Sequence, residues 1–278
     1  MFSVEVLSQP CAARGTPAPA TRQTGPVNSS ADRPAGPGLG LPAWLAAARV
    51  ADEVRALRPD YAALLITADG LEPGPSDEAS EAVLAAAEQR AAQQLAGSRP
   101  EDLPQVAQWR EAFRGFGAKP QRTRPSVEAL LRRLETGLPR IDRITDVYNA
   151  VSVAFLLPVG GEDLAHYVGP TRLVRAGGDE DFDTFAAGQP VVEHPEPGEV
   201  IWRDDRGVTC RRWNWRQCAR TRITATTTTA VFILDGLAAL GTSGLHAAAA
   251  ELTDSLARLS PRARFASRLM GPDGTYGT

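Results

Sequence analysis

The chain has 278 residues, of which 43% are hydrophobic and 23% are charged, and its net charge is −3. Such a chain can bury a substantial core, and its length fits one large domain or two small ones. It has no run of roughly 18 apolar residues, as a membrane helix needs, and residues 1–10 lack the pattern of a secretory signal. We therefore expect a cytoplasmic protein with no membrane partner.

Cysteine and histidine residues offer no pattern for metal or redox chemistry. Cys11, Cys210 and Cys218 are too few for a disulfide framework, and no second Cys or His lies at ligand spacing. The three histidines, His166, His194 and His246, are scattered and match no HExxH or triad motif. We predict no metal site and no cofactor, with Cys210 and Cys218 as free core residues.

The first half of the chain is expected to be mainly helical. Residues 9–42 are rich in Pro, Gly, Ala and Ser, so we predict that residues 1–41 form a disordered tail. Apolar spacing from Pro42 predicts one helix that Pro59 stops, and the next apolar run predicts a buried strand at 61–67. Further helices are predicted at 78–95, with a cap at Ser76-Asp77-Glu78, at 103–113 and at 126–134.

The second half begins with a helix and continues mainly as strands. Apolar spacing from Ile141 to Phe155 predicts a largely buried helix with Asp146 and Asn149 on one side. After it we expect a strand at 171–176, a Pro-rich loop at 190–198, a hairpin of 199–203 and 208–215, and a strand at 224–234 that leads to Asp235. A last helix is predicted at 245–259. A single domain would then span 42–262, with a C-terminal tail at 263–278.

The segment Arg211-Arg212-Trp213-Asn214-Trp215-Arg216-Gln217 alternates large planar and hydrogen-bonding side chains. As a strand it would place Arg212, Asn214 and Arg216 on one face and the remaining residues on the other. Two interpretations remain open. The tryptophans could fill the core while the arginines extend to water, or the segment could form a polar aromatic wall for an anionic or aromatic ligand.

Positive charge is concentrated in two stretches of this acidic chain. Residues 203–222 hold seven arginines against two aspartates, and residues 110–143 hold nine lysines or arginines. Together they could form one patch for phosphate groups, with affinity that falls as salt rises. The alternative is that both stretches are solvated faces paired with acidic neighbours.

Several segments carry a family resemblance through their order along the chain. They are Phe113-Arg114-Gly115-Phe116-Gly117, Lys119-Pro120, Arg124-Pro125-Ser126, Glu128-Ala129-Leu130, Leu138-Pro139-Arg140-Ile141, Asp146-Val147-Tyr148-Asn149, Gly198-Glu199, the 211–217 segment and Thr221 to Thr224. The same order is found in stand-alone proteins built on the editing domain of the phenylalanyl-tRNA synthetase beta subunit, and the resemblance covers about residues 42–260.

This resemblance implies an α+β fold with mixed β-sandwich-like sheets of unusual topology, flanked by helices. In the synthetase, the similar domain hydrolyses tyrosine wrongly attached to phenylalanine tRNA. Nothing in the chain resembles the class II catalytic core, an anticodon-binding domain or an ATP loop. A ligase is therefore excluded, no ATP is expected, and the implied partner is tRNA or aminoacyl-tRNA.

The resemblance also carries over two candidate substrate-binding residues. Asn149 matches the family's pocket asparagine, and Asp235 matches a pocket glutamate that reads the tyrosine hydroxyl. The family's pocket histidine has no counterpart in residues 157–161, its later Thr-x-Ala segment has no clear match, and no catalytic residue is identified. For tRNA binding we infer roles for five residues of the 211–217 segment, with stacking on the terminal adenine by the tryptophans: Arg211, Arg212, Trp213, Trp215 and Arg216.

Three hypotheses for the function follow. The first is a trans-acting aminoacyl-tRNA deacylase that binds tRNA and needs no covalent nucleophile. The second is a non-catalytic tRNA-, RNA- or protein-binding module that keeps the fold. The third is small-molecule binding unrelated to RNA. A deacylase needs an open amino-acid-sized pocket beside Asn149, whereas a module without chemistry could have it filled by its own side chains.

Overall fold

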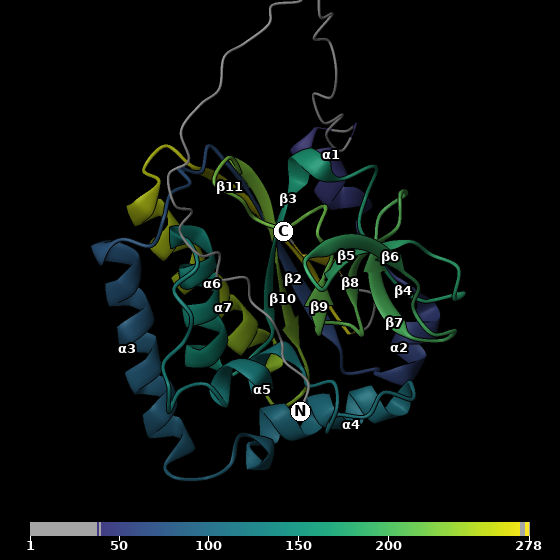
Figure 1. The fold of residues 1–278 in the computed structure, drawn as a ribbon, viewed down its shortest axis with the longest axis horizontal. Coiled ribbons are helices and arrows are strands. Elements are labelled where there is room, and N and C mark those ends of the chain that lie inside the picture. The colour runs from purple at the N-terminus through teal and green to yellow at the C-terminus, as the bar shows by residue number, and fades with distance from the viewer. Residues whose placement is uncertain (1–37, 39, 273–275, 278) are drawn as a thin grey trace, which may run out of the picture. The chain divides into compact units, whose positions relative to one another are not determined.

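The structure is a computed structural model that describes residues 38, 40–272 and 276–277 (Figure 1). The tail predicted at 1–41, with Cys11, lies almost entirely outside the described residues. From Leu41 onward the chain forms two five-stranded sheets and a two-stranded hairpin, with helices packed around them. This is the α+β arrangement that the sequence predicts.

The central sheet is antiparallel throughout, in the order β12-β11-β2-β10-β3. Its two middle strands pair over eight residues, from Thr229 opposite Asp69 to Gly236 opposite Ala62. Both faces of these strands are covered, which explains why they are apolar at nearly every position. The strands are β2 (Ala62–Asp69), β3 (Val159–Asp163), β10 (Thr229–Gly236), β11 (Arg264–Met270) and β12 (Tyr276–Gly277).

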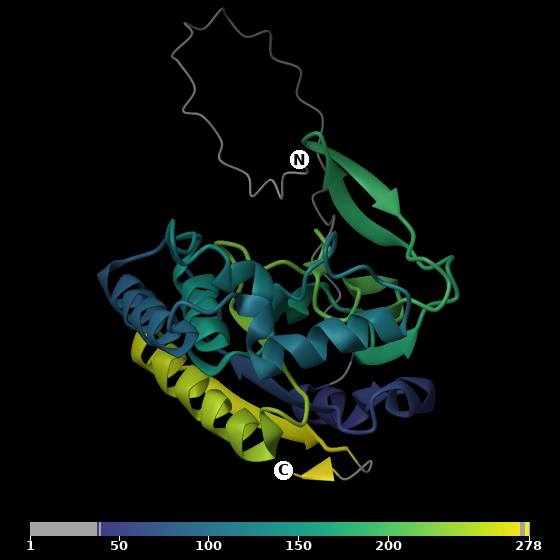
Figure 2. The same cartoon turned by 90° about the horizontal axis from the view of Figure 1, so that it is seen from below.

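Two helices, α6 (Arg143–Phe155) and α7 (Gly241–Leu259), cover one face of this sheet, and α3 (Glu78–Leu95) packs against α6 outside them, as Figures 1 and 2 show. Leu64 and Phe232 point from the sheet into a core that they share with Val147 of α6 and Leu252 of α7. Helices α3 and α6 begin within about two residues of the predicted starts, whereas α7 begins at Gly241, four residues before the predicted start. Asp77 and Ser80 cap α3 reciprocally, and Asp142 caps α6 by accepting hydrogen bonds from the Ile144 and Thr145 amides.

The second sheet and three further helices pack on the other face. That sheet has the order β1-β4-β7-β8-β9, in which β1 runs parallel to β4 and the other pairs are antiparallel. Its strands are β1 (Arg49–Val50), β4 (Arg172–Arg175), β7 (Val200–Arg203), β8 (Val208–Arg211) and β9 (Arg216–Gln217). The helices are α1 (Leu41–Ala47), α2 (Asp52–Leu57) and α4 (Pro104–Gly115), and the core between the layers contains Trp44, Trp109, Trp202 and Trp213.

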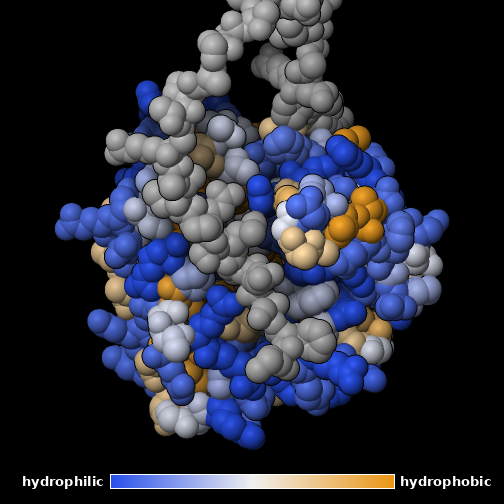
Figure 3. Space-filling view, in the orientation of Figure 1, coloured by the Kyte–Doolittle hydropathy of each residue, from blue (hydrophilic) through white to orange (hydrophobic). Residues whose placement is uncertain are grey.

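The remaining elements lie between or outside these layers. They are η1 (Pro100–Asp102), α5 (Ser126–Leu131), η2 (Leu164–His166) and the hairpin of β5 (Phe182–Ala186) and β6 (Gln189–Glu193). The hairpin projects from the body (Figure 2). Figure 3 shows a mostly hydrophilic surface in the orientation of Figure 1, with an apolar patch in the region of this hairpin, where Phe185 and Val192 are exposed.

Two local predictions in the first half and the middle of the chain are wrong. The single helix expected from Pro42 is split into α1 and α2, because Arg49 and Ala51 donate backbone hydrogen bonds to Thr171 and Leu173 at the edge of β4. The loop expected at 190–198 is a strand over its first part, because β6 pairs with β5. In both places tertiary pairing overrides the local pattern.

The prediction of a C-terminal tail at 263–278 is also wrong. β11 pairs with β2 along its whole length, from Arg264 opposite Asp69 to Met270 opposite Ala63, and Met270 is fully buried. The sequence of this strand gives little sign of burial, because most of its other side chains are exposed or half-buried. The strand is held by backbone hydrogen bonds along β2 rather than by a long apolar run.

Candidate functional site

A cavity of about 210 Å³ lies where β3, β10 and the turn after β8 meet α5 and α6. Asn149 of α6 and Asp235 of β10 both line it, although they are far apart in sequence. The wall also includes three tryptophans and a second acid: Trp202, Trp213, Trp215 and Glu162. The sequence predicts a pocket beside Asn149 but does not predict Glu162 or Trp202 as part of it.

Asp235 is placed at the end of β10, where its side chain is buried. The Tyr61 hydroxyl donates a hydrogen bond of 2.6 Å to one carboxylate oxygen, and the Asn214 amide donates one of 3.3 Å to the other. Burial raises the pKa of Asp235 to about 7, and the two hydrogen bonds oppose this shift only in part. The carboxyl can therefore hold or release a proton near neutral pH.

Glu162 is the acid of the cavity that the sequence interpretation missed. It lies on β3 and is 1% exposed, and its Oε2 accepts hydrogen bonds from the Tyr167 hydroxyl at 2.7 Å and the Thr221 hydroxyl at 2.8 Å. Burial raises its pKa, and the hydrogen bonds from Tyr167, Thr221 and Thr209, with the charge of Arg220, oppose this shift only in part. The only sequence signal was a charged residue directly after Gly160-Gly161, in a segment for which no element is predicted.

Asn149 differs from most buried polar residues because its side chain has no partner. It is 7% exposed, and its amide makes no hydrogen bond to any residue within the described part of the chain. α6 holds it in place, since the neighbouring Tyr148 packs against Phe232 and against the backbone of Gly161. Its donor and acceptor are therefore available to a ligand in the cavity.

Other residues of the cavity wall also carry buried polar atoms without a hydrogen-bond partner. They are the hydroxyl of Ser126, the indole nitrogens of Trp202 and Trp213, the amide oxygen of Asn214 and the Nε of Arg216. Buried polar atoms are nearly always paired in folded proteins. A group of unpaired atoms around one cavity indicates a site whose hydrogen bonds are completed by water or by a ligand.

The segment 211–217 is not the alternating strand that the sequence predicts. β8 ends at Arg211, and Arg212 and Trp213 then adopt left-handed conformations with φ of 47° and 67°. The turn inserts the Trp213 ring among Tyr61 and Trp109, where it is fully buried. Burial of this ring offsets the strain of two successive left-handed residues, which is of the order of 1–2 kcal/mol each.

The arginines of this segment bind acidic side chains of the same domain. Arg211 is buried and forms a paired contact with Glu199, with both distances 2.9 Å, and a further one of 2.9 Å with Glu193. Arg212 binds Glu199 and Arg216 binds Glu193. The guanidinium groups of Arg212 and Arg216 lie within 5 Å of the Trp215 ring centre, at 4.6 and 4.8 Å. Trp215 is half-buried, whereas Trp213 presents no face to solvent.

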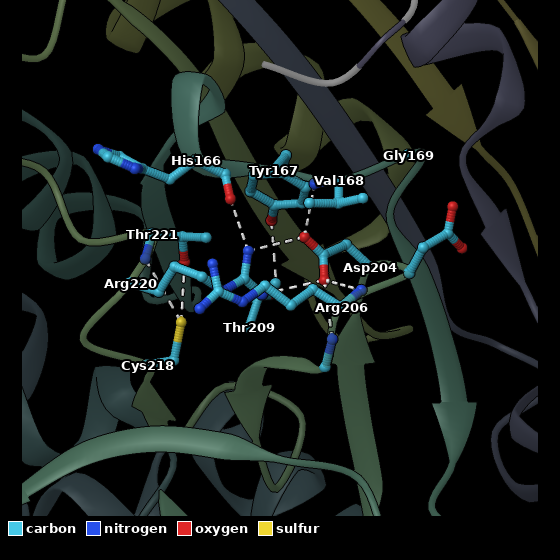
Figure 4. A network of polar contacts seen from close by, with 12 residues as sticks. His166, Tyr167, Val168, Gly169, Asp204, Arg206, Thr209, Cys218, Arg220 and Thr221 are labelled. Carbon is cyan, nitrogen blue, oxygen red and sulfur yellow. Dashed lines mark hydrogen bonds and ion pairs between the residues drawn. The ribbon is translucent and has the colours of Figure 1, made fainter. Parts of the chain in front are cut away.

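A buried ion pair lies at the turn between β7 and β8 (Figure 4). Asp204 is fully buried and accepts hydrogen bonds from two nitrogens of Arg220 at 2.8 and 3.0 Å, and from the backbone amides of Val168, Arg206 and Gly207. This network holds the β7–β8 turn against the segment that contains Tyr167. It thereby positions the hydroxyl that contacts Glu162.

The described residues contain no group of three or more His, Cys, Asp or Glu side chains that could hold a metal ion. Cys210 and Cys218 are free and buried. Cys210 lines the cavity, and burial, followed by the charges of Glu162 and Asp235, raises the pKa of its thiol far above the ordinary value. A thiol held in this way is neutral and is not an activated nucleophile. No helix among the described residues is long and apolar enough to cross a membrane.

The fold and the cavity define an α+β domain with an acid-containing pocket between a sheet and its covering helix. Residues 108–260 match the model of the B3/4 domain. The match spans more than half of the chain, which therefore belongs to the B3/4 domain family, found in the phenylalanyl-tRNA synthetase beta subunit. The chain is thus a domain related to that of an aminoacyl-tRNA synthetase.

Among solved structures, the chain is similar to an N-terminal fragment of the phenylalanyl-tRNA synthetase beta subunit from Pyrococcus horikoshii, at 10% sequence identity and a TM-score of 0.42. The similarity covers 78% of this chain and 49% of that chain, so this chain spans about half the length of the fragment. A comparison with curated proteins gave no match. Family membership rests on the match to the B3/4 model.

Proposed function

We propose that this B3/4 domain is a trans-acting aminoacyl-tRNA deacylase, which binds tRNA in the cytoplasm and hydrolyses the ester of a mischarged amino acid. The observation that supports the proposal is the open cavity that Asn149 and Asp235 both line. A domain that had kept only the fold could fill this space with its own side chains. Here the cavity remains open, with unpaired polar atoms around it.

In this proposal, Asn149 and Asp235 bind the polar groups of the amino acid. The Asn149 amide makes no internal hydrogen bond within the described residues, and the Asp235 carboxyl is held in position by Tyr61 and Asn214. Hydrolysis needs a positioned water and a place for the developing oxyanion. Backbone amides and the ribose hydroxyl of the substrate supply these without a covalent nucleophile, which fits a site whose one thiol is neutral.

The tRNA end would lie against the half-buried part of the 211–217 segment. Trp215 and Arg216 line the cavity, and Arg212 lies over the same ring, so these three residues suit a terminal adenine and its phosphate. Arg211 would act indirectly, because its contacts with Glu199 and Glu193 hold the turn in shape. In this proposal Trp215 stacks on the base, because Trp213 is fully buried.

A non-catalytic tRNA-, RNA- or protein-binding module is the second candidate. The observation that favours it is the pairing of all three arginines of the segment with Glu193 or Glu199, which reduces the positive charge available to RNA. The two candidates differ in one measurable respect. Only the deacylase releases an amino acid.

The test is to incubate the full chain with a panel of mischarged and D-aminoacyl tRNAs and to measure the amino acid released. We expect release from at least one member. Asn149→Ala should lower turnover on every substrate cleaved, whereas Asp235→Asn should change which substrate is preferred and leave tRNA affinity unchanged.

The matched control is Asp254→Asn, which makes the same chemical change at an exposed position of α7. It should behave as the wild type on every substrate. No release from any tRNA that binds would overturn the deacylase in favour of the binding module. No binding of tRNA at all would favour a small-molecule site unrelated to RNA.

A further inference from the structure

The cavity opens between α5 and the chain that joins β8 to β9. On its wall, Ala129 of α5 is exposed and Leu130 is half-buried, and Trp215 and Arg216 are also half-buried. Asp235, on the same wall, is buried. A ligand that is longer than an amino acid must therefore leave the cavity past α5 and Trp215.

The two basic stretches of the sequence differ in how far their charge is neutralised. Residues 203–222 hold seven arginines, and five of them bind an acidic side chain of the same domain. These five are Arg203, Arg211, Arg212, Arg216 and Arg220. In the stretch 110–143, by contrast, Lys119 and Arg122 are exposed, and neither has an acidic partner in the part of the chain that the structure describes. Positive charge that is available to a ligand is therefore found just before α5.

Arg124, in the same segment, has only a shared partner. Its Nε lies 3.5 Å from Oε1 of Glu128 and makes no hydrogen bond. That oxygen already accepts hydrogen bonds from Arg110 at 2.7 Å and from Arg132 at 3.1 Å. Of these three arginines, only Arg132 has a second acidic partner within the described residues, which is Glu101. The Arg124 side chain is 41% exposed, so its charge can reach a further anion.

Buried residues fix the backbone between these cations. Pro120, Thr123 and Pro125 are buried, and the carbonyl oxygen of Lys119 accepts hydrogen bonds from the amides of Arg122 and Thr123 at 2.8 and 3.0 Å. The cationic side chains are thus carried by an ordered backbone. Such a segment loses less conformational entropy on binding than a flexible loop does.

The segment ends at the cavity wall. Ser126 lines the cavity, and its amide donates a hydrogen bond of 3.2 Å to the carbonyl oxygen of Asn214, which lines it too. Arg124 precedes Ser126 by two residues, so the Cα atoms of the two are at most about 7 Å apart. The available positive charge therefore lies next to the opening of the cavity.

From this arrangement we propose that residues 119–126 bind the phosphates of the single-stranded 3′ end of tRNA, with Lys119, Arg122 and Arg124 as the contacts. The inference rests on the proposed function, and it places the phosphates that precede the terminal adenine. Each nucleotide of such a strand adds a negative charge, and both lysine and arginine bind phosphate well. Trp215 offers a stacking face for a base at the same opening, so a nucleic acid strand fits this surface better than an acidic peptide does.

The experiment measures binding of uncharged tRNA to the full chain by fluorescence anisotropy at a series of salt concentrations. The variant carries Lys119→Gln, Arg122→Gln and Arg124→Gln together. We expect weaker binding and a slope of log affinity against log salt that is smaller by about two, because each phosphate contact of a single strand contributes about 0.7. An unchanged slope in the folded variant would overturn the proposal. If the triple variant does not fold, Lys119→Gln with Arg122→Gln decides instead, with an expected reduction of about one.

The matched control removes the same charge elsewhere, through Arg49→Gln, Arg262→Gln and Arg264→Gln. All three arginines are exposed and none lines the cavity. Arg49 lies on β1, at the opposite edge of its sheet from β9, and Arg264 lies on β11, which β2 and β10 separate from β3. Affinity and slope should stay close to those of the wild type. A loss equal to that of the first variant would show that only net charge matters and would overturn the proposal.

A tRNA without its single-stranded 3′ end tests where the contacts lie on the RNA. Wild type and triple variant should bind this shortened tRNA with the same salt slope, because the phosphates that face residues 119–126 have been removed. If the substitutions still lowered the slope by about two, these residues would bind another part of the tRNA, and the proposal would be wrong.

Failure of this inference and failure of the proposed function give different results. Binding of tRNA that depends on residues 119–126, without release of any amino acid, would refute the deacylase alone. Hydrolysis of aminoacyl-tRNA by the triple variant, with the affinity and salt slope of the wild type, would refute the role of residues 119–126 alone.

Discussion

Five buried acids of this domain differ in the kind of partner that they bind. Three of them bind an arginine: Asp204 binds Arg220, Glu128 binds Arg110 and Glu199 binds Arg211, in each case at 2.9 Å or less. In the cavity, Asp235 and Glu162 have only hydroxyl and amide partners. All five are less than 4% exposed, so burial alone does not separate the groups.

The difference shows what each group does. A buried acid that is paired with an arginine and several backbone amides has its charge compensated and fixes neighbouring segments in place. A buried acid with neutral partners keeps an uncompensated charge, and such residues are candidates for binding or proton transfer. The arginine-paired acids therefore support the fold. Asp146 and Asp163 are also buried with hydroxyl and amide partners, and neither lines the cavity, so it is their place on the cavity wall that makes Asp235 and Glu162 candidates for ligand binding.

The largest change in the free energy of unfolding is expected when a buried ion pair is broken. Asp204→Ala would leave the Arg220 guanidinium buried without its partner and would release three backbone amides. We expect a loss of about 3–5 kcal/mol in the free energy of unfolding, measured by urea titration at neutral pH. A loss smaller than that of an exposed substitution such as Asp254→Asn would show that the pair contributes nothing to stability.

In the cavity we expect a smaller change in the free energy of unfolding, and the substitution Asp235→Asn should raise it rather than lower it. Because the folded protein raises the pKa of Asp235 from the ordinary 3.8 to about 7, the group stabilises the fold at low pH, and this contribution is lost as pH rises from about 4 to about 7. The loss is at most about 4 kcal/mol. Asp235→Asn cannot ionise, so its stability relative to the wild type should rise over that range.

The measurement for this prediction is urea unfolding of both proteins at a series of pH values from 4 to 8. Glu162 titrates in both, so its contribution cancels in the difference between them. Parallel pH curves for the wild type and Asp235→Asn would contradict the raised pKa. Asp254→Asn should run parallel to the wild type.

The smallest effect on stability is expected at Arg216, which is half-exposed where Arg211 is buried. Arg216→Gln should cost less than about 1 kcal/mol in the free energy of unfolding. If it faces a phosphate, the change should also lower the slope of log affinity for tRNA against log salt by about one. Arg211→Gln should instead clearly lower the free energy of unfolding and leave the salt dependence of tRNA affinity unchanged. A salt slope that is unchanged in folded Arg216→Gln would remove this residue from the RNA interface.

Prediction from the sequence worked where local signals and burial agreed. The cap at Asp77, the apolar spacing from Ile141 to Phe155 and the apolar strand that leads to Asp235 are local patterns, and the structure has α3, α6 and β10 there. The prediction was wrong where pairing between distant segments determined the secondary structure. β1 interrupts the first predicted helix by pairing with β4, and β11 forms on β2 from a segment whose apolar residues are interrupted by Ser267 and Arg268.

The candidate site shows the same division. Asn149 and Asp235 were named through the family's ordered motifs, and both line one cavity. Glu162 could not be recognised in the same way, because two acids after two glycines form no pattern that distinguishes them from surface residues. Its importance depends on Tyr167 and Thr221, which reach it from two other segments.

By itself, the sequence determined the family and the long helices and central strands, because these follow from motif order, caps and apolar periodicity. Only the tertiary structure decided how the 211–217 segment is used. Alternation in that segment predicts a strand, yet the burial of Trp213 beside Tyr61 and Trp109 turns the chain and directs Arg211 onto Glu199. Contacts between residues far apart in sequence supply the free energy that overrides the local preference, and no local pattern records them.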